Sequence, residues 1–204
     1  EDIKCIDFDG NSYTFVTIGT QIWMAENLKT TSFRDGTAII YPGTDNAAWA
    51  ANTIGAYAWY NNDEATYKDL YGALYNWHAV NSGILCPTGW HVPDETEWTV
   101  LTNYIGGLEE GGGKLKEVGT DHWTEPNAGA TDEYGFKGLP GGWRRHTGEY
   151  GLIGSNSFWW SATAFDATTA WDRHISRATT ILYVGNNGVA YEKGRGFSVR
   201  CIKD

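Results

Sequence analysis

The first thirty residues alternate between hydrophobic and polar side chains. Within residues 3–28 the hydrophobic positions of this alternation include Ile6, Phe8, Tyr13 and Phe15. The turn sequence Asp9–Gly10–Asn11 divides the alternating segment, and a second turn at Gly19 leads into residues 21–28. A period of two interrupted by an Asp-Gly pair is typical of β-hairpins. The pattern therefore predicts antiparallel strands at the start of the fold.

Residues 86–105 carry the most specific helix signal in the chain. Pro87 and Pro93 restrict the backbone of a turn, and Asp94 is a favourable N-cap residue. Glu97 stands three residues after Asp94, as in a capping box. Hydrophobic residues then recur at helical spacing, at Trp98, Leu101 and Ile105. We predict a helix over residues 94–105 that ends at Gly106–Gly107 and forms a packing centre.

The other segments give weaker patterns. Residues 29–70 are rich in small and polar residues and predict long surface loops, whereas residues 71–81 predict a short helix. Gly111–Gly113 predicts a flexible turn, because the Gly-Lys-Ser/Thr ending of a phosphate loop is missing. Residues 119–142 lack periodicity and predict a long ordered loop. Short strands bounded by turn residues are predicted at 143–145, 158–163, 170–175, 181–184 and 196–202.

This order of elements places strands first, then two helices, a long loop and further strands. Such an order is typical of an α+β fold in which helices lie to one side of antiparallel sheets. No linker-like segment or shift in composition divides the chain. We therefore expect one domain over residues 1–204, built from short antiparallel strands, two helices and long ordered loops.

Composition and charge narrow the classes of partner. The formal net charge is −10, with a pI near 4.9, so the clustered Lys and Arg that a nucleic-acid site requires are absent. The chain holds 11 Trp, 12 Tyr and 26 Gly beside one Met, which favours a loop-rich fold with an aromatic core. No hydrophobic run approaches the roughly 20 residues of a membrane span. We expect neither nucleic acid nor a membrane span.

The three cysteines are Cys5, Cys86 and Cys201. They lack the CxxC spacing of zinc sites, and three are too few for a disulfide framework. We predict one disulfide, Cys86–Cys201, and one free thiol. Closing a loop of that length is worth roughly 4–5 kcal/mol in the chain-entropy model. Three reduced, buried cysteines are the alternative.

Six motifs, taken in order, resemble the Fibrobacter succinogenes major paralogous domain family. They are IGTQIWMAENL at 18–28, YGALYNW at 71–77, CPTGWHVP at 86–93 with Glu97–Trp98, GFKGLPGG at 135–142, WWS at 159–161 and FSVRC at 197–201. Together they span nearly the whole chain. The family looks like one of secreted or lipid-anchored bacterial surface proteins and has no established enzymatic activity.

The family is in turn similar to the C-type-lectin-like and formylglycine-generating-enzyme folds. This resemblance implies a C-type-lectin-like core in which the N-terminal and C-terminal strands lie side by side. Cys5 would then also neighbour Cys201, so a Cys5–Cys201 disulfide is a second possible pairing. The copper site of the formylglycine-generating enzymes needs paired cysteines near the end of the domain. Cys201 has no such neighbour in sequence, so we do not expect that activity.

No residue pattern indicates a catalytic or transition-metal centre. The five histidines occur singly, without HxH or HxxxH spacing, at His78, His91, His122, His146 and His174. Among them, His91 lies in the rigid turn before the helix at 94–105, and we expect it to be a hydrogen-bonded structural residue.

A calcium site is one interpretation of the loop at 119–142. Its Glu125–Pro126–Asn127 triplet is the one by which many C-type lectins bind Ca²⁺ and a sugar, although the companion Trp-Asn-Asp tripeptide is missing. Oxygen-donating side chains nearby would complete the ligand set, so the candidate metal residues are Glu125, Asn127, Asp132 and Glu133. The other interpretation is that Asn127 binds the backbone of its own loop.

The last third of the chain mixes aromatic residues with Arg and Asn, as binding surfaces do. The candidate ligand-binding residues are Phe165, Asp166, Trp171, Arg173, His174, Arg177, Thr180, Tyr183, Asn186, Asn187 and Tyr191. We predict a non-enzymatic module for binding or adhesion at the bacterial cell surface, with a glycan or a surface protein as ligand. The alternatives are an enzyme acting on glycans through loop carboxylates, and a structural part of a surface or pilus assembly.

Overall fold

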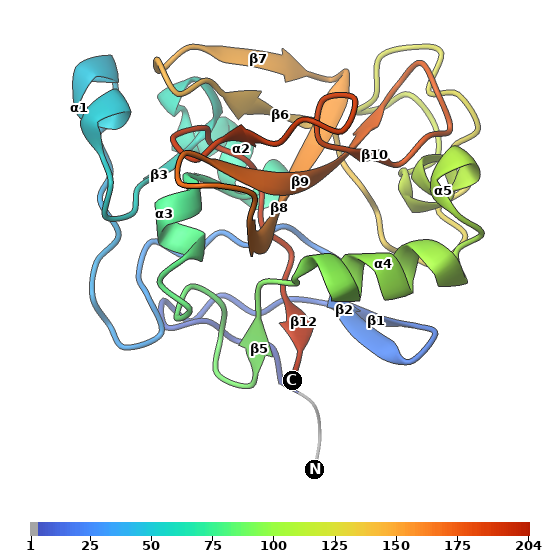
Figure 1. The fold of residues 1–204 in the computed structure, drawn as a ribbon, viewed down its shortest axis with the longest axis horizontal. Coiled ribbons are helices and arrows are strands. Elements are labelled where there is room, and N and C mark those ends of the chain that lie inside the picture. Colours follow the sequence, from blue (N-terminus) through green and yellow to red (C-terminus); the bar gives the residue numbers. More distant parts are fainter. Residues whose placement is uncertain (1–3) are drawn as a thin grey trace.

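The computed structural model describes residues 4–204 and has an α+β fold (Figure 1). The helices are α1 (Asn46–Ala51), the 3-10 turn η1 (Tyr60–Asn62), α2 (Glu64–Tyr71), α3 (Trp77–Val80), α4 (Glu95–Tyr104) and α5 (Leu108–Leu115). The strands are β1 (Phe15–Ile18), β2 (Gln21–Met24), β3 (Tyr57–Ala58), β4 (Leu74–Tyr75), β5 (Trp90–His91), β6 (Gly141–Arg144), β7 (Tyr150–Ile153), β8 (Asn156–Ala164), β9 (Thr169–Ser176), β10 (Tyr183–Val184), β11 (Tyr191–Glu192) and β12 (Ile202–Lys203). None of the helices within residues 4–204 is long and apolar enough to cross a membrane.

The strands form two main sheets. The smaller has the order β1-β2-β12-β5, so the C-terminal strand lies between elements from the first half of the chain. The larger has the order β10-β9-β8-β6-β7, and β11 pairs with β9. Neighbouring strands are antiparallel except for β6 and β8, which are parallel where Gly142 faces Ser157. In Figure 1 the larger sheet lies above α4, and the smaller sheet lies below it.

Helix α4 forms as its sequence predicts. The Asp94 carboxylate accepts a hydrogen bond from the Glu97 amide at 2.9 Å, and the Glu97 carboxylate accepts one from the Asp94 amide at 2.9 Å. This capping box satisfies two amides that the first helical turn leaves without a partner. Trp98, Leu101 and Ile105 are completely buried, so the predicted hydrophobic face is the face that packs.

The core contains two large hydrophobic clusters. One surrounds α4 and includes Trp23, Trp98 and Trp159, whereas the other includes Trp160 and Phe197. Trp23 and Trp98 lie 4.8 Å apart between ring centroids, which joins the smaller sheet to α4. Aromatic side chains bury large areas, and tilted or edge-on ring pairs add favourable electrostatics. The aromatic core expected from composition is therefore present in both clusters.

The Cys86–Cys201 disulfide is present and joins segments separated by 115 residues. Cys5 is buried and has a free thiol. The prediction of one disulfide and one thiol is confirmed, and the alternatives of three reduced cysteines or a Cys5–Cys201 pair are wrong. Burial raises the pKa of the Cys5 thiol to about 12, and the nearby Asp7 carboxylate acts in the same direction.

Several expected elements differ from the observed ones. The fold has more than two helices, because the segment predicted as loops, residues 29–70, contains α1 and all but the last residue of α2. Each of these helices has an aspartate N-cap, Asp45 and Asp63. These helices are short, and α2 has no buried residue, so hydrophobic periodicity does not reveal them. Of the helix expected over residues 71–81, only Trp77–Val80 is helical in the structure, as α3. The first half of the expected helix instead forms β4, which pairs with β3.

The predicted flexible turn at Gly111–Gly113 is wrong, because these glycines lie inside α5. A Cβ atom on Gly112 would overlap the Ile181 carbonyl, and one on Gly113 would press on the Gly129 carbonyl. The Gly113 amide also donates to Thr180 at 2.9 Å. The glycines therefore permit close approach of two backbone segments, a use that local propensity does not reveal.

The last third contains the expected strands at β6, β8, β9 and β10. Residues 196–202 form a regular strand only at β12, because the preceding residues make single bridges to two different partners. Phe197 bridges Tyr75, and Ser198 bridges Trp159. Residues 119–142 lack helix and strand until β6 begins at Gly141, as predicted for a long ordered loop.

Candidate ligand-binding face

The candidate face lies where the β8–β9 turn meets the loop that follows β10. Phe165 is 57% exposed and lies edge-on to Trp171, with ring centroids 5.0 Å apart. Val189 is 64% exposed. Its carbonyl and the Trp171 ring both lie against Gly185. We call Phe165, Trp171 and Val189 the apolar patch. Phe165 is exposed and Trp171 is half-buried behind it, so the two rings offer a rigid contact area suited to binding a partner.

The β8–β9 turn beside the patch is held by local hydrogen bonds. The Asp166 carboxylate accepts bonds from the Thr168 and Thr169 amides, each at 2.7 Å. Led by the Thr168 amide bond, these contacts lower the pKa of Asp166 to about 2. Lys193 donates through Nζ to the carbonyls of Asp166 and Ala167, at 2.7 and 3.1 Å. Asp166 therefore shapes the turn, which gives Phe165 a fixed position.

Two open hollows adjoin this turn. The first, which we call the Tyr191 hollow, has a volume of about 300 Å³. Its lining is Thr169, Asn186, Val189, Ala190, Tyr191, Glu192 and Arg195. The second, the His146 hollow, has a volume of about 330 Å³ and is lined by Ala50, Asn52, Thr53, His78, His146, Ala167, Thr168, Glu192, Lys193 and Gly194. Val189 belongs to both the apolar patch and the Tyr191 hollow, so the two surfaces are continuous.

The charged groups around the hollows are largely paired with one another. Arg195 donates from Nε to the Glu192 carboxylate at 2.6 Å, and its guanidinium lies 4.7 Å from the centroid of Tyr191. His146 Nδ1 is buried without a hydrogen-bond partner and lies 3.6 Å from Glu192. Partial burial and the nearby Lys193 lower the pKa of His78. His78 is therefore neutral at pH 7 and can both donate and accept a hydrogen bond.

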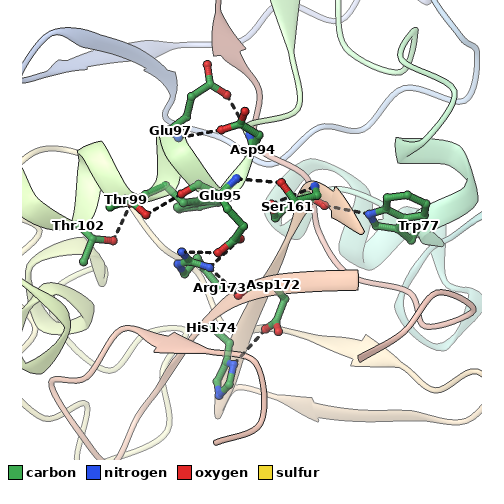
Figure 2. A network of polar contacts seen from close by, with 12 residues as sticks. Trp77, Asp94, Glu95, Glu97, Thr99, Thr102, Ser161, Asp172, Arg173 and His174 are labelled. Carbon is green, nitrogen blue, oxygen red and sulfur yellow. Dashed lines mark hydrogen bonds and ion pairs between the residues drawn. The ribbon is translucent and has the colours of Figure 1, made fainter. Parts of the chain in front are cut away.

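Strand β9, which carries Trp171, is fixed by a buried polar network (Figure 2). Arg173 is 3% exposed and makes two hydrogen bonds of 2.9 Å to the Glu95 carboxylate at the start of α4. Asp172 is completely buried and lies 3.0 Å from His174 Nδ1, while the His174 ring stacks on Tyr183. Bidentate Arg–carboxylate pairs restrict geometry strongly. The network therefore gives the apolar patch a rigid base.

The sequence-predicted ligand residues separate into three groups. Those gathered at the candidate face are Phe165, Asp166, Trp171, Asn186, Asn187 and Tyr191. Arg173 and His174 are buried in the network and present little surface to a ligand. Tyr183 lies on β10 opposite His174, whereas Arg177 and Thr180 follow the other end of β9. There Arg177 donates to the Glu125 carbonyl, and Thr180 donates to the Glu109 carbonyl at 2.7 Å.

Two of the candidate calcium residues, Asn127 and Asp132, form hydrogen bonds with nearby backbone, and the other two are exposed. Asn127 is 7% exposed, and its Nδ2 donates to the carbonyls of Glu117 and Gly119, at 2.9 and 2.6 Å. Asp132 accepts a 2.7 Å hydrogen bond from the Lys137 amide. Burial raises the pKa of that carboxyl. Glu125 and Glu133 are exposed. Across residues 4–204, no cluster of three or more His, Cys, Asp or Glu side chains is arranged to hold a metal ion.

Two buried cations hold the loop at 119–142. Lys116 is completely buried, and its Nζ donates to the carbonyls of Ala128, Ser176 and Thr179 at 2.6–3.0 Å. Arg200 donates to the carbonyls of Phe136 and Lys137. Each cation joins the loop to another part of the fold through backbone oxygens. Asn127 and Asp132 likewise serve the backbone, so much of the polar chemistry of this loop is internal.

Sequence reasoning missed several residues that line the hollows, namely Asn52, His78, His146, Glu192 and Arg195. They come from four separate stretches of the chain, and no spacing in the sequence connects them. The expectation that His91 is a hydrogen-bonded structural residue is confirmed. His91 lies 2.6 Å from Asp204 and 2.8 Å from Glu97, so it joins the C-terminus to α4.

Comparisons with known proteins support the resemblance carried by the six motifs. The sequence model of the Fibrobacter succinogenes major domain matches residues 16–203. No curated protein and no solved structure matches the chain. The match extends from β1 through β12 and so includes both sheets, α4, the disulfide and the candidate face. The chain therefore belongs to the Fibrobacter succinogenes major domain family.

Proposed function

We propose that this protein is a non-enzymatic binding module that recognises a glycan through the apolar patch and the adjoining hollows. The observation that carries the proposal is the Phe165–Trp171 pair beside a hollow lined by both hydrogen-bond donors and acceptors. Sugars present apolar C–H faces and a rim of hydroxyl groups. An exposed aromatic ring suits the first, and Asn186, Glu192 and Arg195 suit the second.

A glycan accounts for the chemistry of this face better than a highly charged ligand does. Glu192 is paired with Arg195, and Lys193 is used by backbone carbonyls, so the surface offers few free charges. The net charge of −10 also disfavours polyanions. A surface protein that presents an aromatic or polar loop is the second ligand class consistent with the same patch.

The proposal also covers where the protein works in the cell and which known fold its core resembles. The Cys86–Cys201 disulfide supports an oxidising environment, and we propose export to the bacterial cell surface, either secreted or lipid-anchored. Short antiparallel strands, a capped helix and long ordered loops support a C-type-lectin-like core. In such a core the two cations Lys116 and Arg200 order the long loop through its backbone carbonyls.

A glycan array tests this function directly. The wild-type protein is expected to bind a defined subset of glycans, and Trp171→Ala and Phe165→Ala are expected to lower binding at least tenfold without a large change in melting temperature. Phe8→Ala is the matched control, since Phe8 is 59% exposed in the N-terminal turn. If the wild type binds glycans and both face variants bind them equally well, the proposed location of the binding site is refuted. An identical array with a chelator tests the calcium interpretation of Glu125 and Asn127.

A further inference from the structure

The Tyr191 and His146 hollows meet at Glu192, which lines both. Arg195 holds one edge of that carboxylate at 2.6 Å, and His146 Nδ1 lies 3.6 Å from the other oxygen. The side chain therefore lies where the two hollows meet and is held there by Arg195. A single carboxylate placed in this way can accept hydrogen bonds from two consecutive units of one ligand.

The sizes of the hollows indicate one small unit in each. Their volumes are about 300 and 330 Å³, at the lower end of the range for small-molecule sites, about 300–1,000 Å³. Neither hollow alone would enclose a long oligomer. The Tyr191 hollow adjoins the apolar patch through Val189, so the first unit of the ligand is expected there, with the second in the His146 hollow.

The linings favour an uncharged ligand rich in hydroxyl groups. Asn186 offers a donor and an acceptor on one side of Glu192, and His146 and His78 do the same on the other. The His146 ring lines its hollow, so a hydroxyl group bound there can form a hydrogen bond with the exposed part of the ring. Among the charged residues of the lining, Glu192 and Arg195 neutralise each other, and Lys193 is occupied by two carbonyls.

From this geometry we propose that the face holds two adjoining subsites and that its ligand is a neutral oligosaccharide of at least two units. The inference rests on the proposed glycan-binding function and adds the length and charge of the ligand. The Tyr191 hollow takes one sugar, the His146 hollow takes the next, and Glu192 binds hydroxyl groups of both.

Isothermal titration with defined sugars tests the inference. The probes are three series built from glucose, mannose and galactose, each from one to four units long. In the series that binds, affinity is expected to rise at least tenfold from one unit to two and then to level off. Equal affinity for one and two units, or a continued rise to four units, would overturn the inference while leaving glycan binding intact. If none of the three series binds, both the two-subsite inference and the proposed glycan-binding function are refuted.

Variants assign the two subsites. His146→Ala is expected to abolish the gain from the second unit and to leave binding of the single sugar unchanged, whereas Asn186→Ala weakens both. His122→Ala is the matched control, because His122 pairs with Glu117 in the loop at 119–142 and lines neither hollow. A His146→Ala variant that keeps the full gain from the second unit would contradict the assignment.

Discussion

Three buried cations in this protein hold backbone in place. Lys116, Arg144 and Arg200 are all at most 1% exposed, and each donates to backbone carbonyls. A buried cation is costly unless its donors are satisfied, and carbonyl oxygens satisfy them without a second charge. Composition alone would place these residues at the surface. Their contacts show that they are part of the interior.

His91 provides a pH-dependent contact at the residue scale. Its partial burial opposes protonation, but the hydrogen bonds to Asp204 and Glu97 prevail and raise its pKa. A raised folded-state pKa means that protonation stabilises the fold below the unfolded pKa of about 6.5. This contribution is lost as the pH rises through the folded-state pKa. We expect stability to decrease over that interval.

The effect should be small, because the His91 side chain is 38% exposed and exposed ion pairs contribute less than about 1 kcal/mol. His91→Gln is expected to remove this part of the pH dependence when urea unfolding is measured at pH 5 and pH 8. His78→Gln is the control, since its pKa is shifted in the opposite direction. If the stability of His91→Gln changes between pH 5 and pH 8 by as much as that of the wild type, this assignment is contradicted.

At the scale of elements, the long loop at 119–142 depends on partners from outside itself. The Asn127 side chain binds backbone carbonyls near the start of the loop. Lys116 and Arg200 then connect the loop to β9 and to the C-terminal segment. A loop of this length without regular structure is expected to be functional or mobile. The internal cations explain how it is ordered.

Replacing Lys116 tests that explanation. Burial lowers the pKa of Lys116 to about 8, so its amine carries a charge at pH 7. Lys116→Met would leave three buried carbonyls without a donor, at a cost of about 1–3 kcal/mol for each that water does not reach. We expect a loss of several kcal/mol in unfolding free energy and faster amide hydrogen exchange in residues 124–131.

Lys114→Met is the matched control for Lys116→Met. Lys114 lies two residues earlier and approaches Glu110 and Glu133 only at 3.8 and 3.9 Å. Its replacement is expected to change stability by less than about 0.5 kcal/mol. Similar effects of the two substitutions on stability and exchange would show that the carbonyl contacts of Lys116 do not order the loop.

At the scale of the whole molecule, the first and last parts of the chain are brought together. Strand β12 pairs with β2 and β5, and the Cys86–Cys201 disulfide lies in the same region. The Trp90 indole also donates to the Lys4 carbonyl at 3.0 Å. These contacts join residues far apart in sequence, so closing the disulfide restricts a large part of the unfolded chain.

Removing the disulfide should therefore destabilise the protein strongly. For a separation of 115 residues, the chain-entropy model gives a loss of about 4–5 kcal/mol, or roughly 10–20 °C in melting temperature. Cys86→Ala with Cys201→Ala is the variant, and calorimetry is the measurement. A dithiol reductant is expected to lower the melting temperature of the wild type and of Cys5→Ala equally. A double variant that melts within 2–3 °C of wild type would contradict the expected effect.

Sequence alone determined the features whose signals are local. The capping box and hydrophobic spacing of α4 lie within about ten residues, and the turn at Gly19 connects adjacent strands, so neighbouring residues suffice to specify both. The six motifs also sufficed to indicate the family. The sequence also proposed Phe165, Asp166, Trp171, Asn186, Asn187 and Tyr191 as ligand-binding candidates, because aromatic and amide residues cluster there.

Only the tertiary structure decided which of those residues lie together at the candidate face. Arg173 and Trp171 are two positions apart on β9, yet Arg173 is buried because it donates hydrogen bonds to Glu95 of α4, 78 residues away in sequence. The glycines of α5 and the buried Lys116 depend on backbone from distant segments. The hollows join side chains from four parts of the chain. Such long-range contacts depend on how the sheets and loops pack, and no periodicity within one segment encodes them.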